Sequence, residues 1–108
     1  MLREAMLNHL GYKPNDALME KMGKIIANTK DYEKIEKHIA DLHDHLKVNK
    51  GFVAISNSED YLKIKIESGE EEMVAEAINK IEHFAEKYKV KLDKVEGKNT
   101  FYILGFNK

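Results

Sequence analysis

The stretch Thr100-Phe101-Tyr102-Ile103-Leu104-Gly105-Phe106, close to the end of this 108-residue chain, decides the fold. Successive side chains of a β-strand point to opposite faces of the sheet. Both faces of this strand would therefore be apolar, with Phe101 and Ile103 on one and Tyr102, Leu104 and Phe106 on the other. Such a strand usually lies inside a sheet whose two faces are both covered, by helices, a subunit or a ligand. We expect it at the centre of the sheet, and the functional question is what covers its second face.

A second stretch, Tyr61–Glu67, has the opposite pattern and predicts a strand with one solvated face. Its residues alternate strictly between apolar and polar up to Ile66. The apolar side holds Leu62, Ile64 and Ile66, and the other side holds Tyr61, Lys63 and Lys65. The segments Phe52–Asn57 and Val90–Glu96 predict two further strands, each joined to the next by a run of turn-forming residues. The expected sheet is built from two hairpins.

Helices are predicted for most of the remaining chain, because apolar residues recur there at helical spacing. The expected helices cover residues 2–10, 15–29, 32–48 and 69–89. Asn15 and Asp31 are expected to cap the second and third of these helices. Ser68 and Glu71 have the spacing of a capping box, in which the side chain of each residue accepts a hydrogen bond from the backbone N–H of the other.

The order of elements from residue 32 onward is helix, strand, strand, helix, strand, strand. This order matches a ferredoxin-like sandwich whose first strand has been moved to the end of the chain. We therefore predict an α+β fold with N-terminal helices followed by a ββαββ sheet of permuted strand order, in which the helices 32–48 and 69–89 cover one face. Residues 1–108 would form a single domain, with a helical N-terminal extension at 1–30 and the core at 31–108. The other sheet face is left for residues 2–29 or for a partner.

Charge and composition exclude several classes of function. Eighteen basic and nineteen acidic residues nearly cancel, which disfavours a protein that grips nucleic-acid phosphates over much of its surface. The chain has no cysteine, so disulfides, thiolate zinc sites and cysteine nucleophiles are excluded. No apolar run has the length of a signal peptide core or a membrane span, and we expect a cytoplasmic protein that does not bind membranes.

No catalytic motif is present: the sequence has no phosphate-binding glycine loop, Gly-x-Ser-x-Gly, His-Glu-x-x-His or calcium loop. We predict a non-enzymatic module without cofactors, which binds a protein partner or a second copy of itself. One predicted surface is the open sheet face with Tyr61, Lys63, Lys65, Tyr102 and Phe106. The other is a methionine-rich N-terminal face containing Met1, Met6, Met19 and Met22, since flexible thioethers adapt to partners. Alternatively, these methionines pack residues 2–29 onto the chain's own sheet.

A first alternative is single-stranded nucleic-acid binding on the open sheet face. Tyr61, Lys63 and Lys65 beside Tyr102 or Phe101 of the adjacent strand resemble, in composition, the aromatic and basic surfaces on which RNA bases stack. A winged-helix arrangement of residues 2–67 is a weaker version of this hypothesis. Its recognition helix, 32–48, would carry more acidic than basic residues into a groove lined by phosphates.

A second alternative is a weak metal site on the helix 32–48. His38, Asp41 and His45 lie on one flank of its apolar stripe, at about 100° per residue. His38 and His45 are about 10.5 Å apart along the helix axis, so a zinc site needs Asp41 and a further ligand from another element. The simpler interpretation is that these histidines border the core, with their nitrogen atoms in water.

Overall fold

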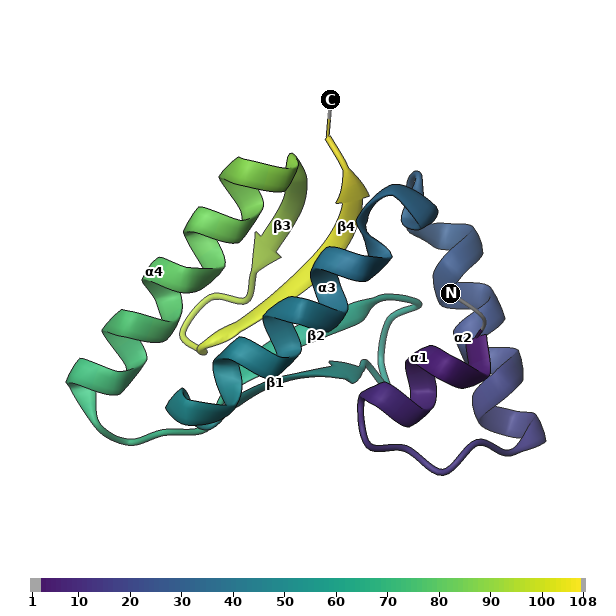
Figure 1. Cartoon of the computed structure of the whole chain (residues 1–108), viewed down its shortest axis with the longest axis horizontal. Coiled ribbons are helices and arrows are strands. Elements are labelled where there is room, and N and C mark those ends of the chain that lie inside the picture. Colours follow the sequence, from purple (N-terminus) through teal and green to yellow (C-terminus); the bar gives the residue numbers. More distant parts are fainter. Residues whose placement is uncertain (1–2, 108) are drawn as a thin grey trace.

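The computed structural model describes residues 3–107 and contains one four-stranded antiparallel sheet with helices packed on one side (Figure 1). The helices are α1 (Arg3–His9), α2 (Asp16–Asn28), α3 (Tyr32–Leu46), the short 3-10 helix η1 (Lys47–Asn49) and α4 (Glu71–Tyr88). The strands are β1 (Gly51–Ile55), β2 (Leu62–Ile66), β3 (Val90–Lys94) and β4 (Thr100–Phe106). The predicted α+β class is confirmed. Met1 and Leu2, which belong to the predicted N-terminal helix and methionine-rich face, lie outside the described residues.

The strands are arranged in the order β1-β2-β4-β3, and every neighbouring pair is antiparallel. The last strand of the chain is therefore central, as its apolar sequence predicts. In the β2–β4 pair, Leu62 lies opposite Ile103 and Lys63 lies opposite Tyr102. This register places apolar residues of both strands on one face and polar residues of both on the other.

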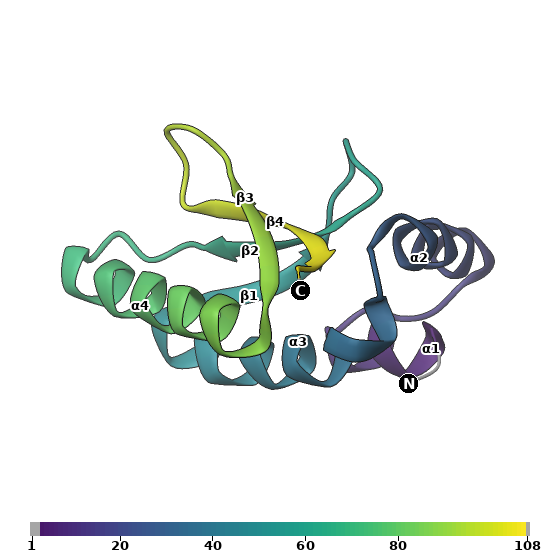
Figure 2. The same cartoon turned by 90° about the horizontal axis from the view of Figure 1, so that it is seen from above.

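The main hydrophobic core lies between the sheet and the helices α3 and α4, which cover the same face (Figure 2). Ile64 and Ile103 of the central strands are fully buried, as are Ile39 of α3 and Ile81 of α4. The alternating burial of β2 follows its sequence pattern, with Leu62, Ile64 and Ile66 buried and the lysines between them half-buried.

Within residues 3–107, no helix is long and apolar enough to cross a membrane.

The helices α1 and α2 pack at one end of the sheet and do not lie over its open face (Figure 2). Their apolar residues Met6, Leu7, Met22 and Ile25 are fully buried and continue the main core. The prediction that Met22 belongs to a partner-binding surface is therefore wrong, because its side chain stabilises the packing of α2 on the rest of the chain. The open face of the sheet has no cover from residues 3–28.

The segment between α2 and α3 joins the sheet at the end of β4. Lys30 forms a short parallel bridge with Gly105: the Lys30 N–H donates to the Leu104 carbonyl at 3.3 Å, and the Phe106 N–H donates to the Lys30 carbonyl at 2.8 Å. Gly105 has a φ of +144°, and a Cβ atom there would lie 2.6 Å from the Lys30 nitrogen. Only glycine permits this close contact between β4 and the backbone of the segment that joins α2 to α3.

The end of β4 departs from simple alternation, because the β3–β4 register shifts between Lys91 and Leu92. Beyond this irregularity, Phe106 lies opposite the buried Val90 and packs against the core. The Lys34 ammonium of α3 is 5.1 Å from the centre of the Phe106 ring. The prediction that Phe106 shares the open face with Tyr102 is wrong, since a bulge reverses the side to which later residues point.

The helix caps follow the sequence only in part. Asn15 caps α2 as predicted, with its Oδ1 accepting from the Leu18 N–H at 2.8 Å. Asp31 precedes α3 in a left-handed conformation and makes no side-chain cap. Ser68 accepts instead from the Glu70 N–H at 3.1 Å, and the predicted capping box with Glu71 does not form, because α4 begins only at Glu71.

Candidate functional site

The sheet face turned away from α3 and α4 carries most of the residues predicted to bind a partner. Lys63 and Lys65 of β2 lie opposite Tyr102 and Thr100 of β4, and all four belong to the two central strands. The β1–β2 loop and the β3–β4 hairpin turn both project from this side of the sheet (Figure 2). The open face therefore has a floor of central strands between two raised loops.

A hollow of about 240 Å³ lies on this face. Its basic lining residues are Lys63 and Lys65 of β2 and Lys98 of the β3–β4 turn. Its hydroxyl groups come from the β1–β2 loop and from β4, and belong to Ser56, Ser58, Thr100 and Tyr102. Ammonium and hydroxyl groups are hydrogen-bond donors, so this lining suits an anionic group such as a carboxylate or a phosphate.

Three of the hydroxyl groups form a chain. The Ser58 Oγ lies 3.3 Å from both the Ser56 Oγ and the Tyr102 phenol oxygen, and Ser56 also accepts from the Glu59 N–H at 3.3 Å. Hydrogen bonds from Ser58 and then Ser56 hold the pKa of Tyr102 below its ordinary value. These contacts orient the hydroxyl groups before any ligand arrives, which lowers the entropy cost of binding.

The charge around the hollow is incompletely neutralised. Lys65 lies 3.6 Å from Glu67, but within residues 3–107 neither Lys63 nor Lys98 has an acidic partner. Acidic residues border the area, since Asp93 of β3 lies opposite Tyr102 and Glu59 follows Ser58 in the β1–β2 loop. The positive charge is therefore confined to the hollow and its margin.

The other predicted binding residues are only partly brought together. Tyr61 lies beside Tyr102, with ring centres 6.4 Å apart and planes inclined by 50°. Met19 is half-buried against the core on α2, at a different place from the open face. Sequence reasoning missed Lys98, Ser56 and Ser58, because their positions depend on how the two loops fold over the sheet.

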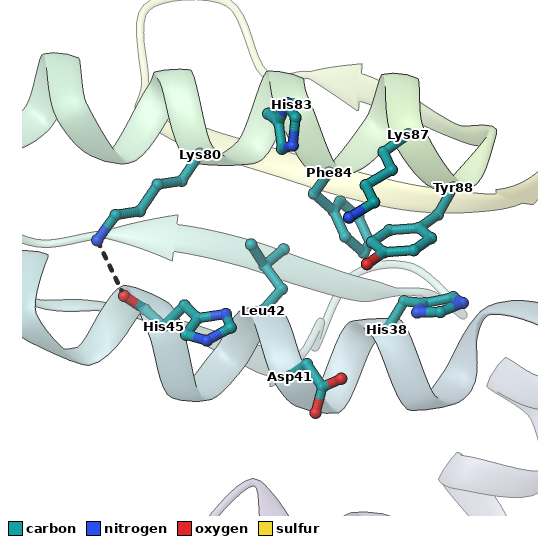
Figure 3. A pocket seen from close by; sticks show the side chains of 9 residues that line it. All are labelled: His38, Asp41, Leu42, His45, Lys80, His83, Phe84, Lys87 and Tyr88. Carbon is teal, nitrogen blue, oxygen red and sulfur yellow. Dashed lines mark hydrogen bonds between the residues drawn. The ribbon is translucent and has the colours of Figure 1, made fainter.

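A second concave surface lies between α3 and α4 on the opposite side of the molecule, with a volume of about 360 Å³ (Figure 3). The predicted metal-binding residues His38, Asp41 and His45 line it, but no group of three metal-ligating side chains converges anywhere in residues 3–107. The His38 ring is stacked on Tyr88, with ring centres 3.6 Å apart. This arrangement agrees with histidines that border the core and lends no support to a metal site.

The edge strand β1 is protected by two side chains that the sequence did not single out. The Val53 N–H donates to His43 Nδ1 and the Ile55 N–H donates to the Tyr12 hydroxyl, both at 3.0 Å. His43 is only 5% exposed, and burial, followed by the nearby Lys47 charge, lowers its pKa. Because these donors are occupied, β1 is a poor site for the addition of a further strand.

No family model, curated protein or solved structure matches the chain. Function therefore has to be inferred from the charge and geometry of the open sheet face and of the groove between α3 and α4.

Proposed function

We propose that this chain is a non-enzymatic binding module that holds an acidic segment of a protein partner on the open face of its sheet. The observation that carries this proposal is the hollow in which Lys63 and Lys98 lie beside oriented hydroxyl groups without an acidic partner in residues 3–107. A carboxylate entering the hollow would gain charge-assisted hydrogen bonds, which are stronger than neutral ones.

The strand order β1-β2-β4-β3, with α3 and α4 on one face, supports the finer description of the fold as a ferredoxin-like sandwich of permuted strand order. In such a sandwich the second sheet face is free for a ligand. The N-terminal helices leave this face open because they pack around the end of α3 and the β1–β2 loop, where Lys21 bonds to Asp60 at 2.9 Å. The partner would therefore meet a surface that exists before binding.

Charge makes self-association through this face the weaker form of the proposal. In a symmetric dimer each copy uses the same surface, so Lys63 and Lys65 would face the lysines of the second copy. Like charges across an interface are costly. An acidic partner satisfies the same surface without this penalty.

Single-stranded nucleic acid is a second candidate, favoured by the neighbouring rings of Tyr61 and Tyr102 between lysines of the central strands. Aromatic side chains in such positions can stack on bases, and lysines can contact the phosphates. The acidic residues Glu59, Glu67 and Asp93 bordering the hollow favour a ligand with one or a few anionic groups over a long row of phosphates.

The test is an NMR titration with three probes: an oligoglutamate peptide, an oligoglutamine peptide of equal length and oligothymidylate. We expect oligoglutamate to shift signals of β2 and β4, and each of the substitutions Lys63→Met and Lys98→Met to weaken binding by about two- to fivefold. Lys37→Met on α3, an exposed lysine outside the hollow, is the matched control and should leave binding unchanged.

Equal binding of oligoglutamine, or oligoglutamate binding that is unaffected by both substitutions, would overturn the proposal. Tight binding of oligothymidylate that is lost in Tyr61→Ala and at high salt, without binding of oligoglutamate, would replace it with the nucleic-acid function.

A further inference from the structure

The groove between α3 and α4 lies on the far side of the helix layer from the sheet and plays no part in the proposed function (Figure 3). Its volume of about 360 Å³ is within the range of small-molecule sites, roughly 300–1,000 Å³. A concavity of this size can hold a small molecule, and we take a small molecule as its occupant.

The groove has an apolar floor and an aromatic wall. Leu42 of α3 and Phe84 of α4 form the floor and are each 4% exposed. At one end, the Tyr88 ring is stacked on His38, with their planes inclined by only 10°. The stacked pair fixes both rings, and it presents a rigid edge to a ligand lying on Leu42 and Phe84 (Figure 3).

The rim of the groove carries lysine and histidine side chains and one aspartate. From α4 it receives Lys80, His83 and Lys87, and from α3 it receives His38, Asp41 and His45. Lys80 is already occupied: its Nζ donates to the His45 carbonyl at 3.2 Å and to Asn49 Oδ1 at 2.8 Å, and it lies 3.4 Å from Glu76.

Lys87 is in a different situation from Lys80. Its Nζ lies 5.4 Å from the centre of the Tyr88 ring and, within residues 3–107, has no acidic partner. Lys87 is exposed, and its ammonium can reach a ligand that lies against Tyr88. Asp41 is the only carboxylate in the lining and lies on the opposite helix.

From this arrangement we infer that the groove binds a small amphipathic anion, a molecule with a flat apolar body and one carboxylate or phosphate group. The body would lie on Leu42 and Phe84 against Tyr88, and the anionic group would meet the Lys87 ammonium. A neutral ligand could use only the floor and would gain nothing from the Lys87 ammonium. Charge and apolar area together specify this ligand class.

Naphthoate, with naphthylmethanol as its neutral counterpart, is a suitable pair of probes for the intact chain. We expect naphthoate to shift the side-chain NMR signals of His38, His45 and His83, and to bind more tightly than the alcohol. Lys87→Met keeps most of the alkyl stem and should weaken naphthoate binding by about two- to fivefold without changing alcohol binding. Asp41→Asn should strengthen naphthoate binding by about twofold, since it removes the opposing charge.

The control is Lys13→Met, an exposed lysine between α1 and α2 that lines neither the groove nor the hollow, and it should leave naphthoate binding unchanged. Equal affinity for the two probes, or naphthoate affinity that neither Lys87→Met nor Asp41→Asn alters, would overturn the inference. Histidine signals that stay unmoved while signals of β2 and β4 shift would also overturn it, because the anion would then occupy the sheet face. A naphthyl phosphate probe separates the two anionic groups: tighter binding than naphthoate assigns the groove to phosphate, and weaker binding assigns it to carboxylate.

Discussion

The two faces of the sheet differ although they are built from alternate residues of the same strands. On β4, Ile103 is fully buried beneath the helices, whereas its neighbour Tyr102 is half-buried on the open face, beside Lys63. The covered face therefore provides stability, and the open face provides exposed polar groups. Because side chains alternate with a period of two residues, the sequence can change one of these properties with little effect on the other.

Substitution of neighbouring residues of β4 is the strongest test of this comparison. Ile103→Ala removes methyl groups from the centre of the core and should lower the free energy of unfolding by about 2–5 kcal/mol. Tyr102→Ala should lower it much less, because its side chain is half-buried on the open face. Urea denaturation of both variants measures the difference, and equal losses would show that the open face is covered in solution.

The backbone bridge between Lys30 and Gly105 ties the segment that follows α2 to β4, and Gly105→Ala should break it. The new Cβ would clash with the Lys30 backbone, and the positive φ is strained for alanine, so we expect a loss of about 1–3 kcal/mol. Faster amide hydrogen exchange in α2 should accompany the loss.

The matched control is Gly97→Ala, which also has a positive φ but whose Cβ would meet nothing within 4 Å. It should cost about 1–2 kcal/mol from backbone strain alone and leave exchange in α2 unchanged. If both variants accelerated exchange in α2 equally, the Lys30–Gly105 contact would not be what positions the N-terminal helices.

The sequence predicted those features of the fold that depend on periodicity. The central position of β4 and the two faces of β2 follow from the spacing of apolar residues, and the site residues Tyr61, Lys63 and Tyr102 are brought together by the resulting register. The contacts of Lys30 with Gly105 are between residues distant in the chain, and no local pattern indicates them. No local pattern indicates either that the Phe106 side chain points toward the core, which results from the bulge beside it.

The histidines of α3 illustrate the same limit. His38 borders the core, in agreement with the simpler interpretation of the sequence. His43 is buried, and its Nδ1 accepts a hydrogen bond from the Val53 N–H of the edge strand β1. A helical projection, at about 100° per residue, shows on which side of the helix a side chain lies. It does not show which strand edge will need a hydrogen-bond acceptor. The candidate hollow escaped prediction in part for the same reason, because Lys98 reaches it from a turn.

Acid should affect the covered side of the molecule before the open side, through His43. Its pKa is lowered in the folded state, chiefly by burial and then by Lys47 and His9, against an opposing effect of Asp44. Protonation therefore favours the unfolded chain. The contribution of His43 to stability should be constant above about pH 6.5, the ordinary histidine value, and fall below it by at most about 1.4 kcal/mol for each pH unit until His43 is protonated in the folded state.

His43→Asn is the matched variant, since the amide oxygen can replace Nδ1 as the acceptor for Val53 without titrating. It should flatten the acid slope of the unfolding free energy relative to the unsubstituted protein. An unchanged slope in this variant, or a His43 pKa at or above that of free histidine in an NMR titration, would show that protonation of His43 does not disfavour the folded state.

Alkali should act on the open side, where the expected effect is smallest. Hydrogen bonds from Ser58 and Ser56 lower the pKa of Tyr102, whereas burial raises that of Tyr32. In a phenolate absorbance titration, Tyr102 should ionise before Tyr32, and Tyr102→Phe should remove the earliest part of the curve. Ser58→Ala should move the Tyr102 ionisation to higher pH, and an unaltered curve in both variants would exclude the hydroxyl chain.

A carboxylate bound in the hollow would disfavour the Tyr102 phenolate. Oligoglutamate should therefore raise the pKa of Tyr102 if it occupies the site beside Lys63, and leave it unchanged if it binds elsewhere.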